Sequence, residues 1–219
     1  MVVATAVSTR LRRSTRTHDE YVVSIRGRHV ITTVTSHASV PRRWVFTTRW
    51  RHAGRLRSGN VGLAVGMGVQ WIPPFRLAAA ADPPPSTLQL CAGHRCLVFH
   101  LAHAAAVPAV LRRFLADKRA VFAAYDVLSD CRKLREHHGM QVARPVELRR
   151  LTGMGNSSLA RMAEEHLGWG NLSKPRKVAT SVWHAARLTK AQVQYACLDA
   201  YISFRLAVHL DAAAGDSRM

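Results

Sequence analysis

The chain has 219 residues, with 32 lysines and arginines against 13 acids, and a formal net charge of +19. Apolar residues make up 48% of it, which excludes a disordered chain and suits one folded domain. No apolar run approaches the ~20 residues of a membrane-spanning helix, so we expect a soluble protein without a membrane partner. The excess of arginine favours a polyanionic partner, although a chain rich in Ala, Arg and Gly is also typical of a GC-rich coding sequence.

Both ends of the chain are expected to lie outside the folded domain. Residues 1–20 are interpreted as a disordered basic tail, because the stretch is rich in Arg, Ser and Thr and nearly free of acids. An organellar targeting segment is the alternative interpretation of this stretch. We expect one folded domain over residues 21–210 and a loose C-terminal tail over residues 211–219.

The cysteines are scattered and form no Cys-x-x-Cys pair. Cys91 and Cys96 have four residues between them and no second pair nearby, which makes a zinc site a weak hypothesis. We therefore expect reduced thiols, which are typical of an intracellular protein, and a location in the nucleus or the cytoplasm.

Three elements are predicted in the first third of the chain. Runs of β-branched residues predict strands over residues 21–25 and 29–35, joined by a turn at Arg26-Gly-Arg. An early proline and one apolar side predict a helix over residues 41–51. Residues 61–72 are interpreted as the first central strand, which ends at two prolines.

The remaining elements indicate the fold class. They are two strands that form a hairpin (87–91 and 96–101), a helix (107–116), a strand (120–125), and three helices (129–139, 157–167 and from 189 onward). Residues 147–151 are ambiguous, and residues 173–179 are predicted to be a basic loop. Three strands joined by hairpins, followed by a strand reached through a helix, indicate a mixed α/β sheet.

The last helix carries a pair of polar side chains. Thr189 and Gln192 form a capping box, which predicts that the helix begins there. Tyr195 and Asp199 are four residues apart and project side by side. A carboxylate with a phenol one turn away can hold a metal ion and orient a water. A tyrosine at the margin of the core and a solvated aspartate are the alternative, which these residues alone favour.

The sequence before this helix favours the metal-site interpretation. Ser-Lys-Pro-Arg-Lys at 173–177, Ser-Val-Trp at 181–183 and Leu-Thr at 188–189 precede the Tyr-x-x-x-Asp motif. This arrangement resembles the third motif of the Werner-syndrome-type 3′-5′ exonucleases, the DEDDy group of the DEDD superfamily. The resemblance implies an α/β fold with an RNase H-like mixed β-sheet flanked by helices.

The resemblance also implies a reaction and its ligands. The family hydrolyses the terminal phosphodiester at a 3′ end with two Mg²⁺ or Mn²⁺ ions about 3.5–4 Å apart, held by carboxylates. Residues 122–134 resemble the second motif, which makes Asp130 a metal ligand near the start of its helix. Asp199 is then the other metal ligand, and Tyr195 orients the water. Asp126 is interpreted as a surface residue.

The first motif departs from the family. Relatives read Val-Gly-Leu-Asp-Val-Glu-Trp-x-Pro, and residues 65–73 here read Val-Gly-Met-Gly-Val-Gln-Trp-Ile-Pro, with Gly68 and Gln70 in place of the acids. No Asp or Glu lies between Glu20 and Asp82 to replace them. We therefore predict a plant-type paralogue with a degenerate site, weakened metal binding and little or no hydrolysis.

Basic residues indicate where nucleic acid would bind. Arginines interleaved with Trp44, Trp50 and Trp71 are typical of single-strand binding by phosphate pairing and stacking. The alternative is that Trp44 and Trp71 belong to the core and the arginines form a solvated face. The residues predicted to bind nucleic acid are Arg42, Arg43, Arg49, Arg51, Lys174, Arg176 and Lys177.

Three hypotheses follow from these observations. The chain is an active 3′-5′ exonuclease, a non-catalytic nucleic-acid-binding module, or a paralogue that binds another protein. Similarity of fold does not choose among them, because function depends on the site. The ligand is expected to be DNA or RNA, as a single strand or a 3′ end, and the sequence identifies no protein partner.

Overall fold

The computed structural model describes residues 7–57, 62–73, 82–172 and 174–216. Its centre is one mixed sheet of eight strands in the order β1-β2-β3-β6-β5-β4-β7-β8. The strands are β1 (Val7–Ser14), β2 (Asp19–Ile25), β3 (Arg28–Thr35), β4 (Leu63–Trp71), β5 (Pro85–Ala92), β6 (Arg95–Phe99), β7 (Ala120–Ala124) and β8 (Pro145–Glu147). β3 pairs with β6, β4 with β7 and β7 with β8 in parallel, whereas the other neighbours are antiparallel.

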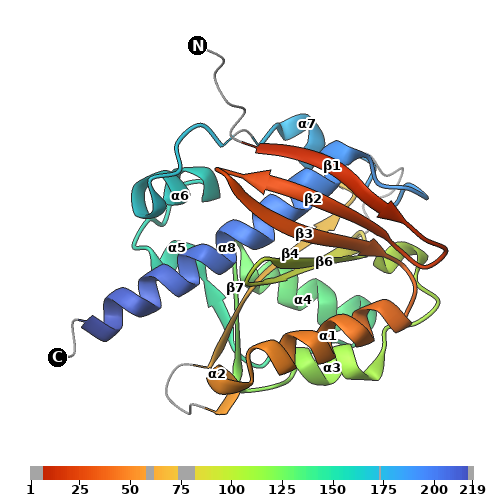
Figure 1. Cartoon of the computed structure of the whole chain (residues 1–219), viewed down its shortest axis with the longest axis horizontal. Coiled ribbons are helices and arrows are strands. Elements are labelled where there is room, and N and C mark those ends of the chain that lie inside the picture. The colour runs from red at the N-terminus through yellow and green to blue at the C-terminus, as the bar shows by residue number, and fades with distance from the viewer. Residues whose placement is uncertain (1–6, 58–61, 74–81, 173, 217–219) are drawn as a thin grey trace.

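Helices cover both faces of the sheet (Figure 1). They are α1 (Ser39–Arg51), α2 (Ala53–Arg57), α3 (Ala109–Leu115), α4 (Val127–His138), α5 (Leu148–Leu151), α6 (Leu159–Leu167), α7 (Arg176–Ala179) and α8 (Lys190–Asp216), with the 3₁₀ turn η2 (Leu101–His103). On one face, Trp44 of α1 and Phe114 of α3 pack with Met67 of β4. On the other, Tyr201 of α8 packs with Met162 of α6.

The last helix begins where the capping box predicts. The Thr189 amide donates to Gln192 Oε1 over 2.9 Å, and the Gln192 amide donates to Thr189 Oγ1 over 3.2 Å. Gln192 is buried and its Nε2 also donates to the Val182 carbonyl over 3.0 Å. The cap therefore joins the start of α8 to the segment that contains Trp183, which is fully buried.

The predicted order of elements from the first central strand onward is confirmed. β4, β5 and β6 are joined as hairpins, α3 leads to β7, and α4 follows with Gly139 as its left-handed C-cap at φ 59°. The ambiguous segment is the end of β8 followed by α5, and the predicted basic loop contains the short helix α7.

Both predicted tails differ from the structure. Residues 7–14, expected in a disordered tail, form β1, which pairs with the open edge of β2. Thr9 Oγ1 also donates to Gln194 Oε1 of α8 over 2.9 Å, so this strand is tied to the last helix. At the other end α8 continues to Asp216, because Ala212–Ala214 have high helix propensity. Residues 1–6 lie outside the described part of the chain.

Two expectations about composition can be compared with the described residues. None of the helices in them is long and apolar enough to cross a membrane. The cysteines are free, and Cys91 faces Cys96 across the β5–β6 hairpin. The described residues contain no group of three or more His, Cys, Asp or Glu side chains arranged to hold a metal ion.

Candidate functional site

A cleft of about 300 Å³ opens between the end of β4, the start of α4 and the middle of α8. Its wall contains the residues at every predicted motif position: Gly68, Gln70, Asp130, Tyr195 and Asp199. Lys174, which precedes α7, completes this group. Residues from four separate segments of the chain therefore meet in one cavity. Sequence reasoning did not place Ser158, Leu159 and Ser203, which also line it.

Two glycines of β4 face α8, and the first of them lets the helix backbone approach the sheet. A β-carbon at Gly66 would lie 1.8 Å from the Ala200 carbonyl oxygen, so only glycine fits there. At Gly68 the nearest atoms would be Gln89 Oε1 at 2.9 Å and the Asp199 β-carbon at 3.8 Å. A side chain at position 68 would therefore point toward Asp199, which fits the predicted register of the strand.

The Asp199 carboxylate contacts the Lys174 ammonium and the Gln70 side-chain amide. Its Oδ1 forms an ion pair with Lys174 Nζ, and Gln70 Nε2 donates to its Oδ2 over 3.3 Å. The Asp199 side chain is 13% exposed and that of Lys174 is 18% exposed, so little water screens the pair. Burial raises the pKa of Asp199, although Lys174 opposes the shift. Burial lowers the pKa of Lys174, but Asp199 and then Tyr195 outweigh it and raise the pKa overall.

Tyr195 lies one turn before Asp199 and borders the same ion pair. Lys174 Nζ lies 4.9 Å from the centre of the Tyr195 ring, within the range of a cation–π contact. The ring also tilts against Trp183, with 6.0 Å between centroids. Burial, and then the negative charge of Asp199, raise the pKa of the Tyr195 hydroxyl, so the phenol is neutral at physiological pH. The Tyr195 ring therefore contacts the Lys174 ammonium and also lines the cleft.

Asp130 lies in the first turn of α4 and is only 4% exposed. Within the described residues it forms no ion pair, in contrast to Asp199. Burial raises its pKa well above the ordinary value, and the carboxylates of Asp126, Asp199 and Glu147 add to the shift. A positive charge near Asp130 would therefore be stabilised.

The neighbouring acids already have structural partners. Glu147 accepts hydrogen bonds from the amides of Asp126 and Val127, over 3.2 and 2.9 Å, and so caps α4. Asp126 is exposed in a left-handed conformation at φ 61°, and its carboxylate pairs with Arg149 over 3.1 Å. Asp126 thus lies at the surface, as expected, on the rim of the cleft.

These residues do not fit a pair of divalent ions. Hard ions such as Mg²⁺ need several oxygen ligands, and the cleft offers two carboxylates besides that of Asp126, which pairs with Arg149. Gln70 directs its amide nitrogen rather than its oxygen at Asp199, and Gly68 has no side chain. The ammonium of Lys174 lies against the one carboxylate on α8 that could hold an ion.

The predicted nucleic-acid-binding residues lie on two faces of the molecule. Lys174 lines the cleft and Arg176 and Lys177 follow it in α7, which packs on α8, whereas the arginines of α1 are on the opposite side of the sheet (Figure 1). Arg176 and Lys177 are exposed. The structure therefore does not bring the two groups of cations together, because α1 and α8 pack on different faces.

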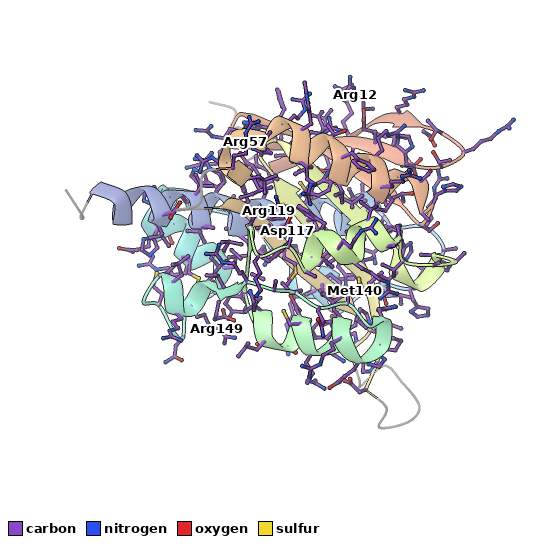
Figure 2. The ribbon with its side chains drawn as sticks, turned by 90° about the horizontal axis from the view of Figure 1, so that it is seen from below. Arg12, Arg57, Asp117, Arg119, Met140 and Arg149 are labelled. Atoms are coloured by element: carbon purple, nitrogen blue, oxygen red, sulfur yellow. The ribbon has the colours of Figure 1, made fainter. Side chains whose placement is uncertain are left out.

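On α1 the arginines differ in their partners. Arg42, Arg43 and Arg51 are exposed, but Arg49 pairs with Asp117 over 3.0 Å. Figure 2 shows Asp117 beside Arg119 where α3 ends, and the same carboxylate binds both arginines. Hydrogen bonds from Arg119, and then the charge of Arg49, lower the pKa of Asp117. Arg49 is therefore less available to phosphate than its neighbours.

The aromatic residues of α1 divide between the core and the surface. Trp44 is 3% exposed and belongs to the core, as its apolar neighbours indicate. Trp50 is 76% exposed and Phe46 is 55% exposed, which is unusual for large apolar side chains. Phe46 was missed, although its spacing of four from Arg42 and Trp50 places the three on one side of the helix. Arg42 lies over the Phe46 ring, 5.9 Å from its centre.

Comparisons with known proteins point to the same family as the motif residues in the cleft. Residues 82–213, more than half of the chain, match the family model described as 3′-5′ exonuclease. The chain belongs to the 3′-5′ exonuclease family. The matched range begins after β4, so Gly68 and Gln70 lie outside it. The fold is that of the exonuclease RNase D from Escherichia coli, with a TM-score of 0.64 and 15% identity over 83% of this chain and 45% of that one.

Two further relatives have exonuclease names. A 3′-5′ exonuclease of Arabidopsis thaliana is 28% identical over 148 residues, 65% of this chain and 50% of its own, so the chain spans about half of that relative. The EXD2 exonuclease domain, in crystals soaked in Mn and GMP, is 23% identical over 84% of this chain and 91% of its own, with a TM-score of 0.45.

Proposed function

We propose that this 3′-5′ exonuclease-family domain binds nucleic acid and hydrolyses it weakly or not at all. The observation that carries the proposal is the content of the cleft: Asp130 and Asp199 are present, and Gly68 and Gln70 stand where the family has acids. Tyr195 one turn before Asp199 supports the DEDDy, Werner-syndrome type within the family. DNA and RNA remain alternative ligands.

Loss of hydrolysis follows from the charge that two metal ions need. In the family reaction, Mg²⁺ or Mn²⁺ activates the water and neutralises the leaving oxygen. Two carboxylates supply half of the negative charge of the family's set of four, and Lys174 neutralises one of them. Losing ligands that position both ions removes several kcal/mol of transition-state stabilisation, which is orders of magnitude in rate.

Binding of a strand is supported by the cations around the cleft. Arg176 and Lys177 are exposed in α7, which begins two residues after Lys174 of the cleft, so they can pair with phosphates. The face of α1 that carries Arg42, Phe46 and Trp50 is a second contact surface, where bases stack and phosphates pair. Because the two surfaces lie on opposite sides of the sheet, we expect them to contact different parts of a strand.

The test is the affinity for a labelled single strand, measured by fluorescence anisotropy for DNA and for RNA. We expect the affinity to fall steeply with salt, because bound phosphates release counterions, and to be no higher in Mg²⁺ than in EDTA. Arg176→Ala and Lys177→Ala should each lower the salt slope by about 1. The control Arg132→Ala removes a cation that already pairs with Glu136 and should change little.

Three results would contradict the proposal. Affinity that needs Mg²⁺ would support an active metal site. Affinity that is no greater than that of another protein of equal charge, and that Arg176→Ala does not alter, would favour a protein-binding paralogue. Rapid shortening of the strand in Mg²⁺ would identify an active exonuclease.

A further inference from the structure

The cleft holds a cation that belongs to the chain itself. Lys174 Nζ lies against Asp199 Oδ1, and its position near the Tyr195 ring adds a second favourable contact. Pro175, the N-cap of α7, follows Lys174 directly and restrains the backbone there. Because both side chains are largely buried, the ammonium is held in the cleft rather than in water.

The Asp199 carboxylate is also engaged on its other oxygen. Gln70 Nε2 donates to Oδ2, so one oxygen faces an ammonium and the other an amide donor. An acid at position 70 would repel Asp199 in the absence of a metal ion, whereas the amide stabilises it. Gln70 and Lys174 therefore contact one oxygen of the carboxylate each, without any ion from solution.

The structure assigns Lys174 the role of resident cation: we propose that its ammonium neutralises Asp199 in place of a divalent ion and excludes that ion from the cleft. A divalent ion next to Asp199 would lie within a few ångströms of the ammonium, where like charges in a poorly hydrated site repel strongly. The ion would therefore have to displace Lys174 before it could bind. This inference rests on the proposed function only for its setting, a strand-binding cleft.

A resident cation accounts for one feature that the loss of acids alone does not. Asp199 keeps a partner although no acid stands at position 68 or 70, so this buried carboxylate is paired with a cation. Asp130 lines the same cleft and forms no ion pair in the described residues.

The test compares Mn²⁺ binding in four proteins, counted from the electron paramagnetic resonance signal of free Mn²⁺. They are the wild type, Lys174→Met, the double variant Gly68→Asp/Gln70→Glu, and the double variant with Lys174→Met added. We expect Lys174→Met to tighten Mn²⁺ binding by about tenfold or more in the double variant, because a positive charge has left the site. The wild type should bind no Mn²⁺ in the cleft.

A matched control separates this role from general charge. Lys190→Met removes an exposed lysine at the start of α8 and should leave Mn²⁺ affinity unchanged. If Lys174→Met does not fold, Lys174→Gln removes the charge and keeps a hydrogen-bond donor, and the same tightening is expected. Asp199→Asn should abolish the gain.

Equal Mn²⁺ affinity with and without Lys174 would overturn the inference, and so would tight Mn²⁺ binding by the wild type. No nucleic acid is used in this experiment. A failure here is therefore distinguishable from a failure of the proposed function, which is measured by strand affinity and its salt dependence.

Discussion

Gly68 of β4 faces Asp199 of α8, so that a β-carbon at position 68 would lie 3.8 Å from the Asp199 β-carbon. The two positions are 131 apart in the sequence and meet at one cleft. A side chain at position 68 would therefore enter the cleft beside Asp199. Gly66, two residues earlier in β4, is glycine for a different reason: it leaves room for the backbone of α8.

We predict that Gly66→Ala destabilises the fold. A β-carbon there would lie 1.8 Å from the Ala200 carbonyl oxygen and 2.5 Å from the Phe204 amide, so α8 must move away from the sheet. The free energy of unfolding should fall by about 3 kcal/mol, measured by urea denaturation. Gly54→Ala in α2 is the matched control: no atom lies within 4 Å of its β-carbon, and a gain of about 0.5–1 kcal/mol is expected. Equal effects of the two changes would contradict the close approach of α8.

Introducing acids at positions 68 and 70 should destabilise the fold, and Mn²⁺ should reverse part of the loss. Gly68→Asp/Gln70→Glu places two new carboxylates beside Asp199 and Asp130, and their repulsion should lower the free energy of unfolding by about 2–4 kcal/mol in EDTA. Mn²⁺ should recover part of this loss, seen as a higher melting temperature, because the ion binds only the folded protein. A loss that is the same with and without Mn²⁺ would show that positions 68 and 70 do not share a site with Asp199.

Stability should depend on the protonation of His100. Its Nε2 lies 3.1 Å from the Trp183 carbonyl oxygen, and burial, followed by the charge of His103, lowers its pKa from 6.5 to about 4. The unfolded chain then binds the proton more tightly, so the contribution is complete above pH 6.5 and is lost as the pH falls toward 4. The loss should reach up to about 3 kcal/mol.

His100→Gln tests this dependence, because a glutamine has no charge to gain in this range. Its unfolding free energy should fall less than that of the wild type between pH 7 and pH 4, measured by urea denaturation at each pH. Parallel curves for the two proteins would contradict a buried neutral His100.

The exposed and buried tryptophans of α1 should behave oppositely. Trp50→Ala should weaken strand binding by about 1–3 kcal/mol, the usual contribution of one stacked base, and leave stability nearly unchanged. Trp44→Ala should lower the free energy of unfolding by about 3–5 kcal/mol, because it empties a core position beside Phe114. Anisotropy and urea denaturation measure the two effects. Unaltered binding in Trp50→Ala would remove α1 from the nucleic-acid surface.

The part of the fold that local signals determine could be predicted from the sequence. The capping box at Thr189 located the start of α8, and the alternation of β4 placed residues 68 and 70 on one face. The family motifs predicted which residues would lie close together in the cleft, because each motif lies on an element that the fold brings there. The order of the elements from β4 onward followed from the local pattern of each segment.

Long-range contacts account for what the sequence did not reveal. β1 resembles a basic tail because its pairing partner is the open edge of β2 and its side chains are mostly exposed. The pair of Lys174 with Asp199 depends on how the segment before α7 folds onto α8, which local propensity does not encode. Similarly, the arginines of α1 and the cations near α7 look like one surface in a list of charges but lie on opposite faces of the sheet.

The central claim is that the fold and register of the site are kept while hydrolysis is lost. The most direct test is degradation of a 5′-labelled single strand and of a recessed duplex in Mg²⁺ or Mn²⁺. We predict that the wild type leaves both substrates intact and that Gly68→Asp/Gln70→Glu shortens them from the 3′ end. Shortening by the wild type that Asp130→Ala abolishes would contradict the claim, because two carboxylates and a lysine would then suffice for the reaction.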